Sequence, residues 1–319
     1  MENTVIYNRT IETGIKTIFP NLFIIGAARS GTSSLHYYLS QHPDIFMSII
    51  KEPHFFSTIE RGYERKYRLS ETDKFYHTKI VKDPETYFSL FDTKKNNYLY
   101  KGESSPSYLY DAHSPQKIFE FNSEARIIII LREPCRRAIS HYNLDYNTGK
   151  EKEHDFKKAV ERDMRYPDKV WGRSHLYVEL GFYFKQIKRY YDVFPADKIY
   201  ILKFEDLISH PLNAVSGILQ FLKLDTNPVN DFKFEIVNKT RNIKNRLFHS
   251  MLYTMKRFDL FKKITEKIPD TVRGAIKDQL YLYDDIEKKI NADTLNYLEE
   301  IFYTEKLLLK NHFGIEWRL

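Results

Sequence analysis

Short apolar runs alternate with amphipathic stretches along this chain, a pattern that predicts strands connected by helices. The clearest run is ARIIIILREP at 125–134, whose four consecutive isoleucines are typical of a parallel strand covered on both faces. Further strands are predicted at 22–25, at the start of 45–57 and in IYILKF at 199–204. Helices are predicted at about 32–41, from Pro134 onward, at 180–194 and at 210–222.

The remaining segments show weaker patterns. Residues 101–110 (KGESSPSYLY) predict a turn-rich loop, and the charged stretch 149–170 predicts a solvated helix or a lid. The polar, basic segment 237–246 predicts another loop. From about 247 the chain is predicted to be helical, with four apolar residues on one helix face: Leu295, Leu298, Ile301 and Phe302.

These elements predict an α/β fold with a central parallel β-sheet flanked by helices. The sequence contains no repeat, no low-complexity tract and no Pro/Gly-rich linker that would divide it. We therefore expect a single domain over residues 1–319. Its core is expected over 20–246, with a C-terminal helical region over 247–319 packed on that core.

Composition narrows the class of protein without identifying it. Hydrophobic residues make up 42% and charged residues 29%, as in ordinary globular proteins, and aromatic residues are abundant at 15%. The net charge of +7 suits an anionic ligand or acceptor. No stripe of arginine or lysine predicts nucleic-acid binding, and nothing in the sequence indicates an oligomeric state.

The cysteine content and hydropathy predict a cellular compartment. Cys135 is the only cysteine, so no disulfide can form within the chain and a reducing compartment is expected. No stretch approaches the roughly 18 apolar residues of a membrane span, and the N-terminus has no apolar signal segment. We therefore expect a cytoplasmic protein without stable membrane association.

The segment FIIGAARSGTSSL at 23–35 carries the first candidate chemistry. An apolar strand, a glycine loop and a hydroxyl-rich helix start predict an anion site, because backbone N–H groups and the helix dipole favour negative charge there. Gly26 and Gly31 have the spacing of a Walker A loop, but Thr32 stands where that loop has its lysine, and Arg29 is the nearest cation. The loop is therefore predicted to bind an anion other than ATP with magnesium.

Three charged residues lie directly after predicted strands: Arg29, Arg132 and Glu205. Ligands of open α/β sheets bind at the carboxyl ends of the strands, so position alone makes these residues candidates for one site. The two arginines suit phosphate or sulfate groups, because a guanidinium can donate two parallel hydrogen bonds.

Three segments occur together in a fixed order: GAARSGTSSL, KEPHFF and LREPCRRAISHY. Together they resemble the sulfotransferases that use 3′-phosphoadenosine 5′-phosphosulfate (PAPS), most closely the bacterial and glycosaminoglycan-type branches. The likeness covers roughly 20–60, 100–145 and 180–246. It implies a P-loop-NTPase-like sulfotransferase fold, with PAPS as donor, adenosine 3′,5′-bisphosphate (PAP) as product and no metal.

The resemblance implies roles for individual residues. The first segment looks like the 5′-phosphosulfate loop of the family, in which Arg29 would stabilise the leaving phosphate. Glu52 matches the general base of the glycosaminoglycan branch, with His54 as the third catalytic candidate. Arg132 and Ser140 match the 3′-phosphate motif. The donor-binding residues implied in this way are Arg29, Ser30, Gly31, Thr32, Ser33, Ser34, Arg132, Ser140, Tyr183, Lys239, Thr240 and Arg241.

The expected reaction is in-line transfer of a sulfuryl group to an acceptor hydroxyl. Lys51, His54 and Ser104 are the candidates for contact with the acceptor. Ser104 follows Glu103 at a position where the glycosaminoglycan branch usually has lysine, so one acceptor-side charge is missing. Small alcohols, phenolics, lipids, natural products and carbohydrates all stay open as acceptors, with a sugar hydroxyl favoured.

Two alternatives come from different classes of protein. A P-loop nucleoside or sugar kinase would need a lysine at position 32 and a magnesium-binding carboxylate after a strand, for which Asp206 is a poor match. A catalytically inactive nucleotide-binding scaffold is the alternative outside enzymes. The presence of both Arg29 and Glu52 argues against it.

Overall fold

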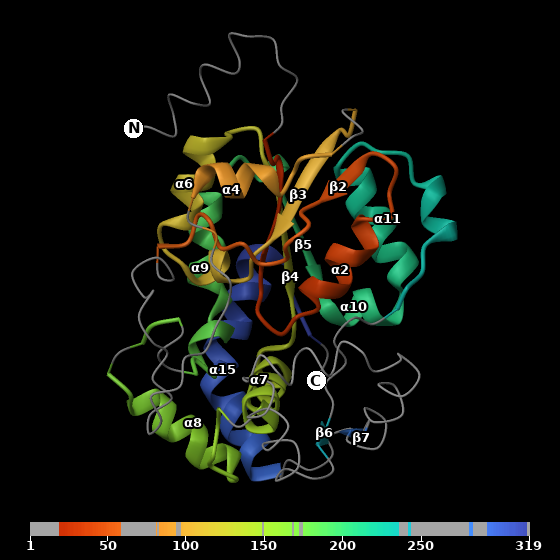
Figure 1. Cartoon of the computed structure of the whole chain (residues 1–319). Coiled ribbons are helices and arrows are strands. Elements are labelled where there is room, and N and C mark those ends of the chain that lie inside the picture. Colours follow the sequence, from red (N-terminus) through yellow and green to blue (C-terminus); the bar gives the residue numbers. More distant parts are fainter. Residues whose placement is uncertain are drawn as a thin grey trace, which may run out of the picture.

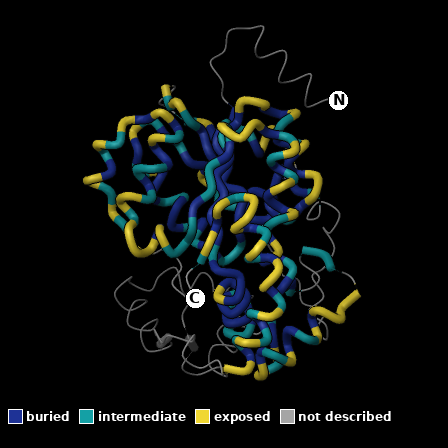
Figure 2. The backbone as a smooth tube through the Cα atoms, turned by 180° about the vertical axis from the view of Figure 1, so that it is seen from behind, coloured by how far each residue is buried: buried dark blue, intermediate teal, exposed yellow. Residues whose placement is uncertain are grey.

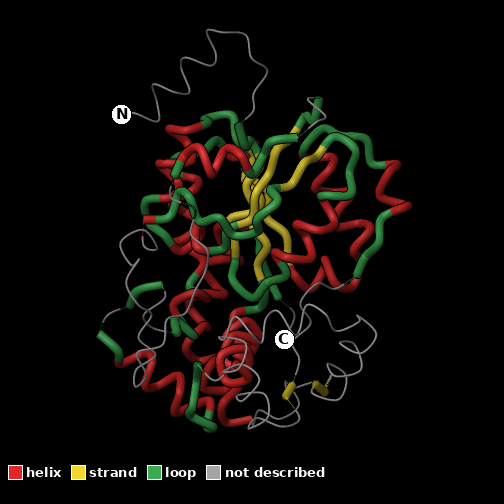
Figure 3. Tube along the Cα trace, viewed as in Figure 1, coloured by secondary structure: helices red, strands yellow, loops and turns green. Residues whose placement is uncertain are grey.

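A computed structural model describes residues 19–58, 81, 83–93, 97–148, 150–167, 169–171, 175–235, 242–243, 281–282 and 292–317 of the chain. Its centre is a sheet of five parallel strands in the order β2-β3-β1-β4-β5 (Figure 1, Figure 3). In chain order the strands are β1 (Leu22–Gly26), β2 (Ile45–Met47), β3 (Tyr100–Ser104), β4 (Arg126–Leu131) and β5 (Ile199–Lys203). The predicted central parallel sheet is therefore confirmed.

The register of the strands brings their carboxyl ends to one edge of the sheet. Ile24 of β1 pairs with Ser104 of β3 on one side and with Ile128 of β4 on the other. β4 is buried from Ile127 to Leu131, as expected for a parallel strand covered on both faces. The loops that follow β1, β3 and β4 therefore begin close to one another.

Helices cover both faces of the sheet (Figure 1). They are α2 (Thr32–Leu39), α4 (Pro84–Ser89), α5 (Ser107–Tyr110), α6 (Ser114–Phe121), α7 (Pro134–Thr148), α8 (Phe156–Arg165), α9 (Tyr183–Tyr191), α10 (Phe204–Ser209), α11 (Pro211–Phe221) and α15 (Ala292–Phe313). α2, α10 and α11 pack with Ile128 and Ile130 on one face, whereas α4, α6 and α9 pack with Ile127 and Ile129 on the other. The alternate isoleucines of β4 thus supply both cores.

Shorter elements complete the described part of the chain. The 3-10 helices are η1 (Glu179–Gly181), η2 (Ala196–Lys198) and η3 (Asn227–Asp231), and β6 (Asn242–Ile243) pairs antiparallel with β7 (Tyr281–Leu282). No helix in this part of the chain is both long enough and apolar enough to span a membrane.

A third layer, made of α7, α8 and α15, lies beyond the carboxyl ends of the strands (Figure 1), and buried backbone continues from the sheet into it (Figure 2). Leu298 and Phe302 of α15 are fully buried there, and Leu295 and Ile301 pack at the margin. A Cβ added to Gly181 would stand 2.7 Å from the Phe302 ring, so helix and loop touch directly. The predicted apolar face of this helix is confirmed.

The predicted loop at 101–110 is wrong, because β3 and α5 occupy most of it. The sequence does not predict this strand because it contains Gly102 and Glu103, and both residue types are depleted in strands. Here Gly102 is required by close packing, because a Cβ would stand 2.7 Å from the sulfur of Met47. The Glu103 carboxylate is buried but accepts hydrogen bonds from hydroxyl groups.

Other predictions are changed in part. The helical prediction from 247 onward is wrong at Tyr281–Leu282, which form β7, and the predicted loop at 237–246 contains β6. The charged stretch 149–170 does form a helix, α8, but Phe156 and Val160 are buried on one face of it, so it is amphipathic. Most of 237–291 lies outside the described residues. The predicted division into a core and a packed C-terminal region stays a prediction.

Truncating the ring of Phe302 should lower the free energy of unfolding by about 3–5 kcal/mol, because Phe302→Ala leaves a cavity next to Gly181 and Phe182. The neighbouring Tyr303 is 64% exposed, so Tyr303→Ala should change that free energy by less than about 0.5 kcal/mol. Denaturant unfolding followed by circular dichroism measures both. Equal losses for the two variants would contradict the packing of α15 described above.

Candidate active site

The loop between β1 and α2, where the sequence predicts an anion site, lies at the carboxyl edge of the sheet. Gly31 precedes α2 with φ 86°, and no side chain caps this helix, so the positive end of the helix dipole faces the loop. The backbone of Arg29 is also left-handed, with φ 68°. The N–H of Ala27 donates to the Ile130 carbonyl at 2.6 Å, which fastens the loop to β4. Buried Ser30 and the first turn of α2 carry the predicted hydroxyls: Ser30, Thr32, Ser33 and Ser34.

Arg29 and Ser140 join two motifs that lie 111 residues apart in the sequence. Nη2 of Arg29 donates to Oγ of Ser140, on α7, at 3.2 Å. Arg132 directly follows β4, the strand that leads into the same helix. The predicted phosphosulfate loop and the predicted 3′-phosphate motif therefore meet at one place.

Phe204, the first residue of α10, supports both motifs. Its ring centroid lies 4.9 Å from the guanidinium carbon of Arg132, in cation–π geometry. A Cβ added to Gly31 would stand 2.7 Å from Cδ2 of the same ring. The sequence pattern predicts Phe204 as the last residue of a strand and gives no sign of this supporting role.

Positive charge is concentrated around the loop. Burial and the charge of Arg132 lower the pKa of Arg29 to about 10. Arg137 of α7 is fully buried, and burial lowers its pKa as well. Its Nε and Nη1 have no hydrogen-bond partner among the described residues. An anion bound at Arg29 would offset these mutual repulsions, so the arrangement favours a negatively charged ligand.

An acidic residue behind Ser140 balances part of this charge. Oδ2 of Asp145, on α7, accepts a hydrogen bond from Nδ1 of His175 at 2.7 Å and lies 3.5 Å from Nε2 of His141. Burial lowers the pKa of His141 to about 3. Burial also lowers the pKa of His175, but its hydrogen bond to Asp145 and the charges of the nearby acidic residues together outweigh burial, and the net shift is upward. Sequence analysis missed this group, because its members have no motif spacing.

The loop at 51–57 brings Glu52 and His54 to the same edge of the sheet. Both residues have a left-handed backbone, with φ 61° and 53°. Oε2 of Glu52 lies 3.7 Å from Nε2 of His54, and Oε1 forms an ion pair with Nζ of Lys51. Burial raises the pKa of Glu52, but the nearby His54 ring and the charge of Lys51 outweigh it and hold that pKa at about 2. Glu52 is therefore ionised at neutral pH.

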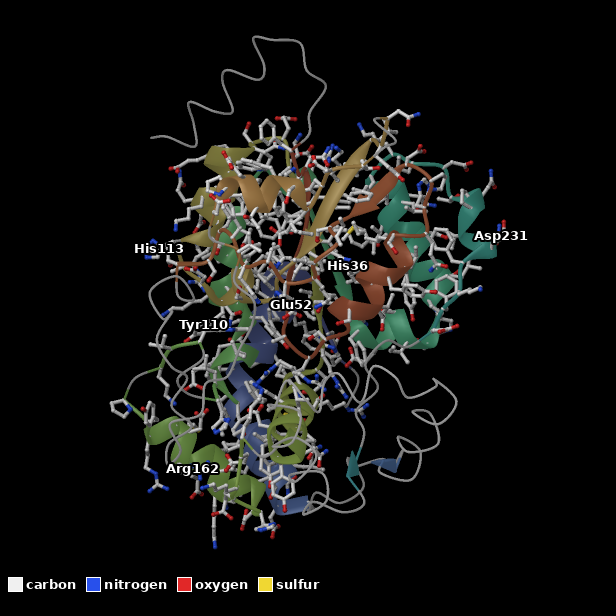
Figure 4. The ribbon with its side chains drawn as sticks, in the orientation of Figure 1. His36, Glu52, Tyr110, His113, Arg162 and Asp231 are labelled. Carbon is white, nitrogen blue, oxygen red and sulfur yellow. The ribbon has the colours of Figure 1, made fainter. Side chains whose placement is uncertain are left out.

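His36, on α2, lies near this carboxylate (Figure 4). Burial and the charge of Lys51 lower its pKa to about 4, so the imidazole is neutral at neutral pH. Nothing in the pattern of α2 distinguishes His36 from an ordinary amphipathic position, and sequence analysis did not identify it.

Two predicted residues of the acceptor side are buried. The ring of His54 is fully buried, and its Nδ1 shares a hydrogen bond with Oγ of Ser107 at 2.7 Å. The carbonyl of Ser104 accepts the N–H of Glu52 at 3.0 Å. The Ser104 hydroxyl is buried as well and has no partner within the described ranges. The structure thus brings Ser104 and His54 to Glu52.

Further candidates have structural partners. The hydroxyl of Tyr183, buried on α9, donates to the Arg132 carbonyl at 3.0 Å. The Glu205 carboxylate accepts the Glu133 N–H at 3.0 Å and Nε1 of Trp317 at 2.9 Å, so it holds two segments of the chain together. The predicted residues outside the described part of the chain are Lys239, Thr240 and Arg241.

One group of side chains has the donor atoms of a metal site. Glu133, Cys135 and Glu299 have ligand atoms within 4.8 Å of one another. Nζ of Lys306 lies 2.7 Å from the Glu133 carboxylate and 2.6 Å from that of Glu299. The lysine supplies the positive charge there, so this group is explained as an ion-pair cluster.

Comparison with known proteins identifies sequence relatives. The chain matches the family model described as Sulfotransferase domain over residues 19–291. Heparan sulfate glucosamine 3-O-sulfotransferase 5 of Mus musculus is 27% identical over 206 residues, which cover 64% of this chain and 54% of that protein. Heparan sulfate glucosamine 3-O-sulfotransferase 6 of Homo sapiens is 26% identical over 209 residues, covering 65% and 53%. The chain thus spans about half the length of these curated relatives.

A solved structure shares the fold over nearly the whole chain. The sulfotransferase from Alicyclobacillus acidocaldarius has a TM-score of 0.66 at 24% identity, covering 94% of this chain and 97% of that chain. The likeness supports the predicted P-loop-like sulfotransferase fold, with its parallel sheet and flanking helices.

Gly31→Ala should destabilise the protein by about 1–3 kcal/mol more than Gly314→Ala, because the new methyl group would press on Phe204. Gly314 is a matched control: its φ of +65° is also left-handed, like the +86° of Gly31, but nothing lies within 4 Å of its added Cβ. Denaturant unfolding of both variants gives the difference. Equal losses would show that Phe204 does not support the loop.

Proposed function

Because the chain belongs to the sulfotransferase domain family, we propose that it transfers a sulfuryl group from PAPS to an acceptor hydroxyl. The observation that carries this proposal is the meeting of two anion motifs at the contact between Arg29 and Ser140. PAPS bears a 5′-phosphosulfate and a 3′-phosphate, and it requires two anion sites at a fixed separation. Glu52, ionised at the same edge of the sheet, adds a group that can accept a proton.

The residues present fit such a donor. The glycine loop and the start of α2 would hold the 5′-phosphosulfate, with N–H groups and Arg29 as donors. Arg132 and Ser140 would hold the 3′-phosphate. The Arg132 guanidinium would donate two parallel charge-assisted hydrogen bonds, and the Ser140 hydroxyl would donate one. Tyr183 would act through the Arg132 carbonyl to which it donates. Contacts from the basic segment Lys239–Arg241 stay a prediction.

Glu52 would act as the general base. As the acceptor oxygen bonds to sulfur, the bond from sulfur to the 5′-phosphate oxygen breaks and the hydroxyl proton moves to a carboxylate oxygen of Glu52. With a pKa of about 2, Glu52 is ready to accept a proton but is a weak base. An acceptor that displaces Lys51 from Oε1 would strengthen it. His54, fully buried, would orient the other oxygen.

Arg29 would stabilise the leaving group. Negative charge grows on the 5′-phosphate as the bond to sulfur breaks, and a fixed guanidinium favours that charge. Although burial lowers its pKa, Arg29 stays protonated at neutral pH. It would therefore serve as an electrostatic clamp and not as a proton donor.

The acceptor that we propose is a carbohydrate hydroxyl. Support comes from the relatives, whose names specify heparan sulfate glucosamine, and from Lys51, a cation beside the proposed base. Ser104 would add a neutral contact next to Glu52. The cytoplasmic location and the independence from metals expected from the sequence stay predictions.

PAP should raise the melting temperature more than adenosine 5′-phosphate does, because only PAP carries a 3′-phosphate for Arg132 and Ser140. A ligand at 100 times its Kd stabilises the folded state by about 2.7 kcal/mol, which thermal unfolding detects readily. Arg132→Ala should remove the difference between the two nucleotides. Arg126→Ala is the matched control, since Arg126 lies at the opposite end of β4 and bonds to Asp197. A larger shift with ATP and magnesium than with PAP would favour the kinase alternative.

Glu52→Gln should lower the rate of sulfuryl transfer by about 10²- to 10⁴-fold, because the amide cannot accept the proton. Arg29→Ala should lower it by about 10²- to 10³-fold through loss of charge stabilisation. Labelled PAPS with a glucosamine-containing oligosaccharide as acceptor measures both rates. Glu120→Gln, on the exposed surface of α6, is the control and should leave the rate unchanged. If Glu52→Gln transfers sulfate as fast as this control, Glu52 is not the base.

A further inference from the structure

We propose that Glu103 is a positioning residue for the 51–57 loop and that it acts through the hydroxyls of Ser105 and Tyr108. The inference rests on the proposed function, in which Glu52 of this loop accepts a proton. It adds a role for a carboxylate that lies inside the protein and cannot touch the acceptor.

The Glu103 carboxylate is the centre of a buried hydrogen-bond network. It lies on β3 and is fully buried. Three hydroxyls donate to it: Tyr87 to Oε1 at 2.6 Å, Ser105 to Oε2 at 2.6 Å and Tyr108 to Oε1 at 2.9 Å. Burial raises the pKa of Glu103, and the three donors act in the opposite direction. An ionised carboxylate, which only accepts, suits all three donors at once.

Two of these hydroxyls connect the carboxylate to the backbone of the 51–57 loop. Oγ of Ser105 accepts the N–H of His54 at 3.1 Å, and the Tyr108 hydroxyl accepts the N–H of Phe56 at 3.2 Å. Each hydroxyl has one proton, which it donates in its hydrogen bond to Glu103. The oxygen lone pairs are thereby left to the loop N–H groups, so the carboxylate fixes the direction of both relays.

The backbone of the loop needs such support. Glu52 and His54 are non-glycine residues in the left-handed region, which persists only where surrounding contacts hold it. The N–H of Glu52 donates to the Ser104 carbonyl at 3.0 Å, and the His54 ring bonds to Ser107. All four supports therefore come from one short segment, residues 104–108, that follows Glu103.

The position of the His54 ring decides the environment of Glu52. Nε2 of this ring faces Oε2 of Glu52 at 3.7 Å, and it carries the proton in the tautomer whose Nδ1 accepts a hydrogen bond from Oγ of Ser107. Releasing the His54 N–H from Ser105 would let this ring move away from the carboxylate. Tyr87 provides the contrast, because its hydroxyl donates to Glu103 and, among the described residues, forms no hydrogen bond with the loop backbone.

The test compares three hydroxyl deletions at the same carboxylate. Ser105→Ala and Tyr108→Phe each remove one relay, whereas Tyr87→Phe removes a hydroxyl from Glu103 and leaves both relays intact. The two relay variants should lower kcat for labelled PAPS and a glucosamine-containing oligosaccharide by about 10- to 100-fold, because small displacements of a catalytic group cost rates of this order. Their PAP affinity should be unchanged. Tyr87→Phe should retain kcat within about threefold, although all three variants lower the melting temperature.

A titration separates this inference from the proposed function. The Glu52 carboxyl, assigned with Glu52→Gln, should titrate in the wild type near its pKa of about 2 and in the relay variants nearer to the ordinary 4.5. Tyr87→Phe should leave that pKa in place. This shift tests the relays even if the wild type transfers no sulfate, an outcome that would overturn the proposed function alone. An unmoved Glu52 pKa in both relay variants, or equal effects of all three deletions, would overturn the inference.

Discussion

The parallel register of β1 with β3 and β4 is the constraint on which the candidate site depends. Side-by-side pairing of Ile24 with Ser104 and with Ile128 brings the carboxyl ends of the three strands to one edge of the sheet. The glycine loop, the 104–108 segment and the start of α7 all begin there. A shift of one residue in either pairing would turn every side chain of a strand to the opposite face and separate these loops. The chemistry of the site is thus held in place by the apolar side chains of the sheet.

The site also concentrates charges that folding alone does not favour. Arg29, Arg132 and Arg137 repel one another. Burial further disfavours the charged forms of Arg29 and Arg137. Glu52 and His54 adopt backbone angles that are rare for their residue types. Such local costs are typical of functional sites and have to be offset by the surrounding structure. The rigid sheet edge and the buried network around Glu103 supply that support.

Much of this fold could be predicted from sequence, because its strongest signals are local. The isoleucine run of β4 and the glycine spacing before α2 each indicate their structure without tertiary information. β3 could not be predicted in this way, since Gly102 and Glu103 are explained only by the Met47 sulfur and by three hydroxyls from distant segments. His36 and Phe204 likewise lie near the candidate site only because the fold brings distant segments together. The motif residues could be identified from the sequence, whereas the residues that support them could not.

Phe204 has a consequence for the choice of nucleotide. One rigid ring packs against the glycine loop at Gly31 and lies over the guanidinium of Arg132, so it sets the separation between these two proposed anion sites. An aromatic ring cannot shorten or lengthen as a flexible side chain can. Under the proposed function, the Phe204 ring selects the donor by length. A donor binds when the distance between its two phosphates matches the width of this ring and its neighbours. Selectivity for the donor would then be a matter of length as well as of charge.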